Sequence, residues 1–300
     1  MKKKNIYHGI IAFIFIFVSF LFTYYLDSSR PLEDNTVSKR VINDNSYGYL
    51  KIYYLDVGQA DSILIDCNGK YMLIDAGNYE DGKLLVDYFD DLGIQKFDYV
   101  IASHPHEDHI GGMSDIINHF SIEHFYMPDV ITTTKTYEDL LDSLERVRLG
   151  VYTPNISDSF LLSNSSIEVL YVGRDESNLN DTSIVLKLTF GNEKFLFMGD
   201  SSDKVEKQII DKDLVSDVLK VGHHGSQYST SLNFLEKVSP KYAIISVGKE
   251  NSYHHPHDIV LSRLSKMNVK VYRTDQDGTI LITSDGNHLI FEKIKTNTNG

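Results

Sequence analysis

The sequence has little cysteine and little positive charge. Its single cysteine, Cys67, excludes an intramolecular disulfide framework and a cysteine-rich zinc module. The strand-like context ILIDCNG predicts that Cys67 is a small packed residue and not a nucleophile. Lysine and arginine total 29 against 42 aspartates and glutamates, a formal net charge of −13. Such an acidic chain does not attract polyanions in general.

Long uncharged runs are also scarce, and the one that stands out is close to the N-terminus. It extends from Ile10 to Leu26, behind lysines at positions 2–4. As a helix it would reach ~26 Å, close to the roughly 30 Å core of a bilayer. We predict a signal anchor, a single transmembrane helix within residues 1–26, and the positive-inside rule places the following domain outside the cell membrane. Secretion after cleavage of a signal peptide is the alternative, although no small-x-small cleavage pattern follows the run.

The rest of the chain divides into a linker and one large domain. Residues 27–48 are polar and lack apolar periodicity, which predicts a linker. Residues 49–300 are numerous enough for a domain with a substantial core. Removing the four basic residues and one acidic residue of positions 1–30 leaves 25 basic and 41 acidic residues, a net charge of −16.

Strand and helix patterns alternate through this domain. Strands are predicted for residues 49–58, 61–69 and 70–77, the last two joined by the hairpin dipeptide Asn68-Gly69. An amphipathic helix (80–93) and a buried strand (97–103) follow. The second half repeats the style and closes with a hairpin over 279–294. Two β-rich halves with helices on their outer faces predict an α/β fold, an αββα sandwich.

Metal-type side chains crowd one loop, SHPHEDHIGG, at the carboxyl end of a predicted strand, where open α/β sheets place their sites. His104 and His106 are two apart in extended chain, so they project to one side and can hold one metal ion. Asp108 and His109 follow a turn and can reach a second ion. A lone His-x-His is more often a polar loop, but this fuller string favours a metal site.

Further ligand candidates lie at the ends of later strands. Asp200 ends FLFMGD and can bridge two ions, and His223 or His224 in KVGHHGS can complete the second site. Imidazole and carboxylate ligands predict two divalent ions, most often Zn²⁺, with Mn²⁺ as the alternative. Two ions ~3.5–4 Å apart supply a water of lowered pKa and stabilise an in-line displacement.

Taken together, the motifs are highly specific. They are YLDVGQADSILI, LIDAG, SHPHEDHIGG, NDTSIVL, FMGD, LKVGHHGS, IISVGKENSYHHPH and TDQDGTI, in this order, from about Tyr49 to Ile294. The chain resembles the metallo-β-lactamase-fold hydrolases, most closely the hydrolase domain of the bacterial competence (DNA-uptake) channel proteins. The resemblance implies that Asp75 supports the metal-binding loop, Asp200 bridges and a histidine of GHHGS is a ligand. The family often carries Asp where this chain has His106.

Two departures limit the resemblance. Many of these hydrolases place another metal-binding histidine between the first motif and the bridging aspartate, where this chain has only His119 and His124, both in apolar contexts that favour packed or surface roles. Asn180 and Asp181 are candidates for the space of the missing histidine. The competence channel also needs a many-helix membrane domain, which one apolar run cannot supply, so this chain is not the channel.

Other side chains are candidates for catalysis or substrate contact. Asp108 and His255 are the catalytic candidates. His255 can donate a proton to a leaving group or hold a phosphate oxygen, and a structural loop histidine is the alternative. Ser226 is a candidate for substrate contact.

The function that these residues favour is dinuclear metal-dependent hydrolysis of a phosphodiester, with nucleic acid or a nucleotide as the substrate class. The alternatives are a cell-wall phosphodiester (phosphorylcholine or teichoic acid), a β-lactam, or a non-catalytic binding or scaffold role on the same fold. The membrane is the other expected partner, and no obligate protein partner is evident from the sequence.

Overall fold

The computed structural model describes residues 47–174 and 177–295 of the 300-residue chain. The predicted signal anchor and residues 27–46 of the predicted linker lie outside this range. Within it, no helix combines the length and hydrophobicity needed to cross a bilayer.

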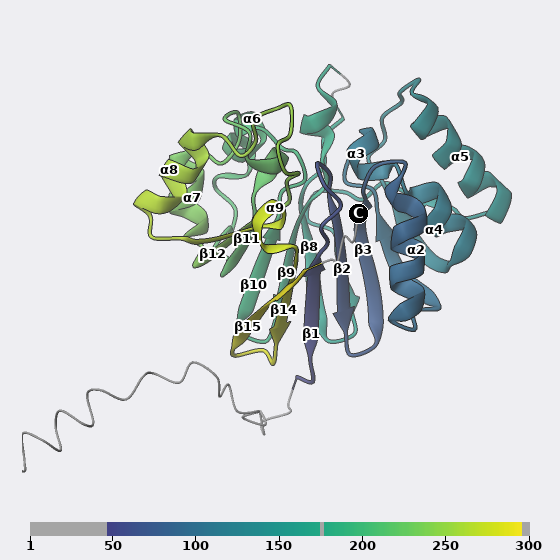
Figure 1. Cartoon of the computed structure of the whole chain (residues 1–300), viewed down its shortest axis with the longest axis horizontal. Coiled ribbons are helices and arrows are strands. Elements are labelled where there is room, and N and C mark those ends of the chain that lie inside the picture. The colour runs from purple at the N-terminus through teal and green to yellow at the C-terminus, as the bar shows by residue number, and fades with distance from the viewer. Residues whose placement is uncertain (1–46, 175–176, 296–300) are drawn as a thin grey trace, which may run out of the picture. The chain divides into compact units, whose positions relative to one another are not determined.

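The first of two β-sheets contains both antiparallel and parallel strand pairs (Figure 1). Within the described residues its strands are, in spatial order, β15 (Leu289–Ile294), β14 (Thr279–Ser284), β1 (Leu50–Tyr54), β2 (Ser62–Cys67), β3 (Lys70–Ala76), β4 (Lys96–Ile101), β5 (Ser121–Tyr126) and β6 (Val151–Tyr152). Pairing is antiparallel from β15 to β3 and parallel from β3 to β6. The predicted hairpin across Asn68-Gly69 is confirmed as β2–β3.

The second sheet has the same division into parallel and antiparallel parts. Its described strands are, in spatial order, β13 (Lys270–Arg273), β12 (Tyr242–Ile245), β11 (Val218–Lys220), β10 (Glu193–Phe197), β9 (Val185–Phe190), β8 (Ser165–Tyr171) and β7 (Ser159–Leu162). Pairing is parallel from β13 to β10 and antiparallel from β10 to β7. In each sheet, therefore, the parallel strands deliver their carboxyl ends, and the loops that follow them, to one edge.

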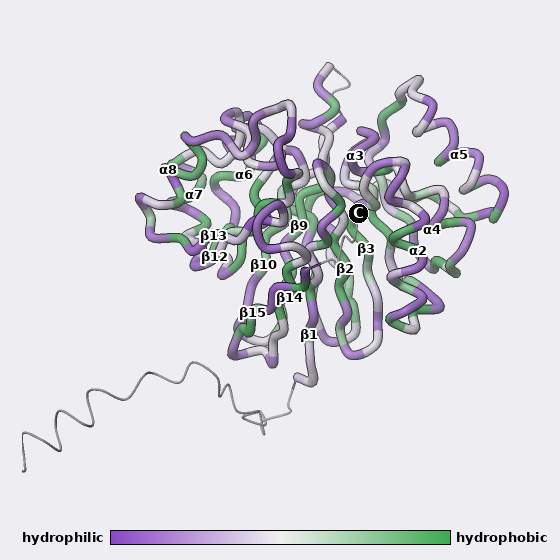
Figure 2. The backbone as a smooth tube through the Cα atoms, in the orientation of Figure 1, coloured by the Kyte–Doolittle hydropathy of each residue, from purple (hydrophilic) through white to green (hydrophobic). Residues whose placement is uncertain are grey.

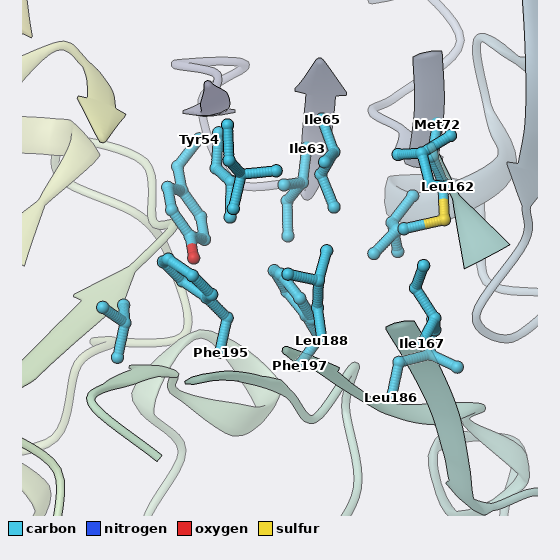
Figure 3. Close-up of a cluster of buried hydrophobic side chains, with 14 of the residues drawn as sticks. Tyr54, Ile63, Ile65, Met72, Leu162, Ile167, Leu186, Leu188, Phe195 and Phe197 are labelled. Atoms are coloured by element: carbon cyan, nitrogen blue, oxygen red, sulfur yellow. The ribbon is translucent and has the colours of Figure 1, made fainter. Parts of the chain in front are cut away.

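Apolar side chains between the sheets form the central core. Ile63 and Ile65 of β2 point toward the second sheet, while Leu64 between them points outward, as the two-residue period of a strand requires. Tyr54 stacks on Phe197 across the interface, with ring centroids 6.3 Å apart. In Figure 3, Tyr54, Ile63 and Ile65 of the first sheet face apolar side chains of the second sheet, which include Leu188, Phe195 and Phe197. Cys67 is buried in the same cluster, which confirms its prediction as a packed residue.

Helices cover the outer face of each sheet. On the first sheet Leu85, Phe89, Ile116, Leu140 and Leu144 pack against Leu73, Val100 and Phe125, and on the second Val205, Phe234, Leu235 and Leu264 pack against Leu196, Leu219 and Ala243. The helices concerned are α2 (Asp81–Asp91), α4 (Met113–His119) and α5 (Lys135–Val147) on the first sheet, and α6 (Asp203–Ile209), α7 (Leu232–Val238) and α8 (Asp258–Lys266) on the second. Figure 2 shows apolar residues along the strands and polar residues on the outer helices. The predicted αββα arrangement is confirmed.

The region between the two predicted halves contains elements that the sequence patterns do not predict. Residues 121–171 form β5, α5, β6, β7 and β8. Helix α5 begins after Thr134, whose side chain accepts a hydrogen bond from the amide of Tyr137, and ends at Arg148 in the left-handed conformation. These elements extend both sheets away from the strands that carry the candidate ligands.

Candidate metal centre

The histidine string follows β4, and it includes the short helix α3 (Glu107–Ile110), labelled at the top of Figure 1. His104 is fully buried, and its Nε2 lies 3.0 Å from Nδ1 of His106. His106 still has extended backbone, so the two rings fall on the same side, as the spacing predicts. Asp108 and His109 lie on α3 itself, one turn beyond.

Asp75 holds this loop in place. It lies in β3 with φ +61°, a left-handed conformation that is uncommon for a residue with a side chain. Its carboxylate accepts hydrogen bonds from the amide and hydroxyl of Ser103, both 2.7 Å, and from Nδ1 of His109 at 2.8 Å. The last bond places a proton of His109 on Nδ1 and orients the ring so that Nε2 faces Asp200.

Asp200 follows β10 and lies between the two halves of the fold. Its Oδ1 is 3.4 Å from Nε2 of His109, and its Oδ2 is 3.6 Å from Nε2 of His223 and 3.7 Å from Nε2 of His224. The Asp200 amide donates to the hydroxyl of Ser183 at 3.0 Å, which fixes the turn. One carboxylate therefore faces imidazoles from both halves, the placement expected of a bridging ligand.

His223 and His224 lie in the 3₁₀ turn η2 (Gly222–Gly225) after β11. Both have left-handed backbone, with φ of +50° and +51°, and such strain in non-glycine residues is concentrated at functional sites. Nδ1 of His224 is 3.0 Å from the carbonyl oxygen of Ser246, which can only accept, so this nitrogen carries the proton. Nε2 of His224 then faces Asp108 Oδ2 at 3.3 Å.

The charges at this centre favour a cation. Burial works against protonation of His109, but the carboxylates of Asp200 and Asp75 hold its pKa well above the ordinary range. His224 is also buried, and Asp200 and Asp61 raise its pKa to about 10. Conversely, the pKa of Asp200 lies well below its usual value despite burial, because of His224 and His109. These carboxylates stabilise positive charge at the point where the ring nitrogens converge. A divalent ion bound there would provide that charge in place of the protons on the rings.

The donor atoms fit a metal ion. One ligand atom from each of Asp108, His109, Asp200 and His224 lies within 4.8 Å of the other three. Among the described residues, His109 Nε2, Asp200 Oδ1 and His224 Nε2 are buried and have no hydrogen-bond partner. Buried polar atoms are rarely left unpaired in a folded protein. His104 lies beside this group, its ring centroid 4.1 Å from that of His109, and with His106 offers a second set of nitrogen donors.

The site opens into a cleft of about 1070 Å³. Of the residues predicted from sequence, those that line it are His106, Asp108, Asn180, Asp200, His223, His224 and His255. His104, His109 and Asp75 are buried and are not among the lining residues. Ser226 is buried as well and does not line the cleft. Its hydroxyl accepts a hydrogen bond from the amide of Tyr228.

Asn180 and Asp181, both in the 3₁₀ turn η1 (Leu179–Thr182), have different surroundings. Asn180 lines the cleft, and its Oδ1 is buried without a hydrogen-bond partner among the described residues. Asp181 accepts from the Ser202 amide at 2.9 Å and from Asn178 Nδ2 at 2.7 Å, and it is not a lining residue. Asn180 is therefore exposed to the cleft, and Asp181 connects two loops through its hydrogen bonds.

The remaining histidines fall into two groups. His255 lines the cleft, with its ring centroid 5.4 Å from that of His223, and burial followed by His223 and His224 lowers its pKa to about 4. It is thus an uncharged ring at neutral pH. His119 pairs with Asp90 at 2.9 Å, and His124 stacks on Tyr99, which agrees with the packed or surface roles predicted for them.

Sequence patterns missed a buried ion pair beneath the site. Nζ of Lys220 lies 2.7 Å from Oδ2 of Asp61, and both side chains are about 1–2 % exposed. The other oxygen, Oδ1 of Asp61, is 3.5 Å from Nδ1 of His224. The available clue is the lysine near the end of the apolar strand DVLKV, immediately before GHHGS. Gln59 also connects two loops, since its Oε1 accepts a hydrogen bond from the amide of Gly248 at 3.0 Å.

Comparisons with known proteins agree with this geometry. A family profile described as "Metallo-beta-lactamase superfamily" matches residues 55–249. The "ComE operon protein 3" of Bacillus subtilis (strain 168) is 31% identical over 248 residues, which cover 75% of this chain and 32% of that protein. The "Competence protein ComA" of Neisseria gonorrhoeae is 29% identical over 231 residues, covering 75% and 31%. The chain thus spans about a third of the length of the curated relatives that it matches.

A solved structure shows the same fold. The metallo-β-lactamase-fold protein YhfI from Bacillus subtilis superimposes with a TM-score of 0.57 at 13% identity, covering 79% of this chain and all of that one. At this identity the likeness concerns the fold alone. The family match, the two-sheet fold and the clustered donors agree, and the chain belongs to the metallo-β-lactamase superfamily and is related to bacterial competence proteins.

Proposed function

We propose that this protein is a dinuclear metal-dependent phosphodiesterase whose domain faces outward from a membrane anchor. The observation that carries the enzymatic part is the group of Asp108, His109, Asp200 and His224 donors, with unpaired buried atoms, at the floor of a cleft of about 1070 Å³. A non-catalytic scaffold gains nothing from burying so many imidazole and carboxylate donors in one place, because charged groups are costly to desolvate. The outward-facing anchor rests on the lysines at positions 2–4 and the apolar run behind them.

The chain supplies the following parts of the reaction. His104 and His106 would hold one ion, Asp108, His109 and His224 the other, and Asp200 would contact both. When bound, Zn²⁺ or Mn²⁺ ions lower the pKa of a water and offset negative charge on the phosphoryl oxygens. Water adds to phosphorus, the bond from phosphorus to the alcohol oxygen breaks, and the alcohol leaves with a proton.

His255 is positioned to orient the phosphoryl group, and Asn180 lines the same cleft. Nδ1 of His255 and Oδ1 of Asn180 are buried and lack a hydrogen-bond partner among the described residues, and both side chains line the cleft. The uncharged His255 ring carries one N–H, and it donates that hydrogen bond to a phosphoryl oxygen or to the leaving oxygen. The N–H of His255 would thus contact the part of the substrate that gains charge in the transition state, whereas Asn180 Oδ1 can only accept, so it suits a cation or an O–H group.

Nucleic acid or a nucleotide is one substrate class, and the relationship to proteins named for competence supports it. A cell-wall phosphodiester is the second candidate, and a specific observation favours it: the lining of the cleft contains carboxylates but, among the described residues, neither lysine nor arginine.

Turnover of bis(p-nitrophenyl) phosphate by the purified full-length chain, with metal content measured on the same sample, tests the proposal. We expect about two metal ions per chain and release of p-nitrophenol that stops on chelation and returns with Zn²⁺ or Mn²⁺. A protein that binds well under one metal per chain and releases no p-nitrophenol would support the scaffold alternative. Hydrolysis of a β-lactam but of no diester would show that the protein is a β-lactam hydrolase and not a phosphodiesterase.

A further inference from the structure

The wall of the cleft is acidic beyond the needs of the metal site. Its carboxylates are those of Asp56, Glu80, Asp81, Glu107, Asp108 and Asp200. Two divalent ions carry four positive charges, so they would offset Asp108, Asp200 and two further charges, and the six carboxylates would keep a net negative charge. Asp56, Glu80, Asp81 and Glu107 lie outside the proposed ligand set and would have no ion in direct contact.

The partners of these four carboxylates do not neutralise them. Asp81 accepts from the amide of Asn78 at 2.8 Å, Glu107 from the amide of Tyr79 at 3.1 Å, and Asp56 from the amide of Gly58 at 3.4 Å. Within residues 47–174 and 177–295, no lysine or arginine forms a salt bridge with any of the four. The carboxylates also act on one another, since Glu80 and Glu107 add to burial in raising the pKa of Asp81.

An aromatic face lies on the same cleft. Tyr253 lines it, is 63% exposed, and stacks on His255 with ring centroids 5.7 Å apart. A tyrosine ring in an acidic cleft attracts an organic cation through the negative face of the ring, in addition to the attraction of the carboxylates. A second observation marks the cleft as a ligand site: the lining residues Asn180 and His255 each have a buried side-chain atom, Oδ1 and Nδ1, without a hydrogen-bond partner among the described residues.

We propose that the cleft selects a zwitterionic phosphodiester, in which one esterified alcohol carries an ammonium group. The inference rests on the proposed function, which places the phosphate at the metal site. The ammonium group then lies among Asp56, Glu80, Asp81 and Tyr253, where its attraction adds to binding. A nucleic acid strand would instead bring further phosphates against these carboxylates, and this repulsion disfavours it.

The test compares two diesters with the same leaving group on the metal-loaded full-length protein. They are p-nitrophenyl phosphorylcholine, which has no net charge, and thymidine 5′-(p-nitrophenyl phosphate), which carries one negative charge. We expect kcat/KM to be about tenfold or more higher for the choline ester at low ionic strength, and the ratio to shrink with added NaCl as the charges are screened. An equal or reversed ratio overturns the inference.

Charge reversal in the cleft provides the matched variants. Glu80→Lys should lower the preference for the choline ester about threefold or more, as expected for one charge close to the ligand. Glu236→Lys, on the exposed face of α7, makes the same change outside the cleft and should leave the ratio unchanged. The inference is also overturned if Glu80→Lys leaves the ratio of the two kcat/KM values unchanged, or if Glu236→Lys changes that ratio by the same amount.

Failure of the proposed function gives a different result. Should neither diester be hydrolysed, titration calorimetry of the same two diesters with the same protein still measures the preference. Tighter binding of the choline ester without turnover would uphold the charge selection and contradict the phosphodiesterase proposal. Rapid hydrolysis of bis(p-nitrophenyl) phosphate without preference for the choline ester would uphold the phosphodiesterase proposal and contradict the charge selection.

Discussion

Asp200 is the residue at which both halves of the fold meet, since its two oxygens face His109 from one half and His223 and His224 from the other. Replacing it with alanine should reduce the metal content from about two ions per chain to one or fewer, because a bridging carboxylate serves both ions. The rate of phosphodiester hydrolysis should fall by at least about 100-fold. Elemental analysis and steady-state kinetics measure the two effects.

The control for Asp200→Ala is Asp87→Ala, which removes an exposed carboxylate of α2 that, within the described part of the chain, pairs only with Lys83. It should keep both metal content and rate. An Asp200→Ala protein that retains two ions would remove the bridging assignment.

Lys220 is the residue whose loss should cost most stability away from the ligands. Lys220→Met leaves the buried Asp61 carboxylate without its ammonium partner, which costs about 3–5 kcal/mol in comparable buried pairs. Urea unfolding of chelator-treated protein measures this free energy without the contribution of bound metal. The double variant Lys220→Met/Asp61→Leu should recover most of the loss, because neither member of the ion pair is then buried alone.

The surface pair of Lys241 and Asp217 supplies the control for Lys220. Its N–O distance is 2.8 Å, but the lysine side chain is 71% exposed, so Lys241→Met should cost under about 1 kcal/mol. Equal losses from Lys220→Met and Lys241→Met would show that the Asp61–Lys220 pair does not carry the stability assigned to it.

At the scale of single elements, α3 depends on close approach to the loop after β3. A Cβ added to Gly111 would lie 2.2 Å from the carbonyl carbon of Asn78 and 2.3 Å from the nitrogen of Tyr79. Both are backbone atoms, so Gly111→Ala must push α3 away from this loop. We expect a loss of about 1–3 kcal/mol in stability and weaker metal binding, because Asp108 and His109 move with the helix.

Gly150→Ala is the matched substitution, since nothing lies within 4 Å of the added Cβ. It should be neutral or stabilising by up to about 1 kcal/mol through the entropy of the unfolded chain. Thermal unfolding and a metal titration of both variants check the pair. Unchanged metal affinity in Gly111→Ala would mean that the position of α3 does not control the ligands.

Elements differ in how well the sequence predicts them. The β2–β3 hairpin is predictable because its turn dipeptide and its alternation are local. Residues 121–171 are harder to predict, because several of their strands bury few side chains. In β5 only Phe125 is fully buried, and both residues of β6 are exposed, so no apolar period marks these strands.

For the whole molecule, we predict that the hydrolase domain is independent of the N-terminal segment. The three apolar clusters of the described structure draw only on residues from Leu50 onward, and so do all the candidate ligands. A truncated chain that begins at Asn45 should unfold cooperatively and keep kcat/KM within about twofold of the full-length protein. An inert or insoluble truncated chain beside an active full-length chain would contradict this.

The orientation of the whole molecule in the membrane is a further prediction. The cluster of lysines at positions 2–4 precedes the apolar run, so the hydrolase domain should lie outside the cell membrane. Protease added to intact cells should therefore digest the domain, while a cytoplasmic control protein stays intact. Digestion only after lysis would place the domain in the cytoplasm.

The donor-rich string from His104 to His109, the αββα class and the family can all be predicted from the sequence. For the donors the reason is local, because spacing along one strand-to-helix loop decides which side chains share a side. The sequence left open the partner of Asp61 and the surroundings of Asn180, Asp181 and Ser226, all of which depend on contacts between distant segments. Lys220 meets Asp61 across 159 positions, and Asp181 binds the amide of Ser202 on another loop. Such contacts depend on how two sheets stack and which loop ends meet, and no local period encodes that.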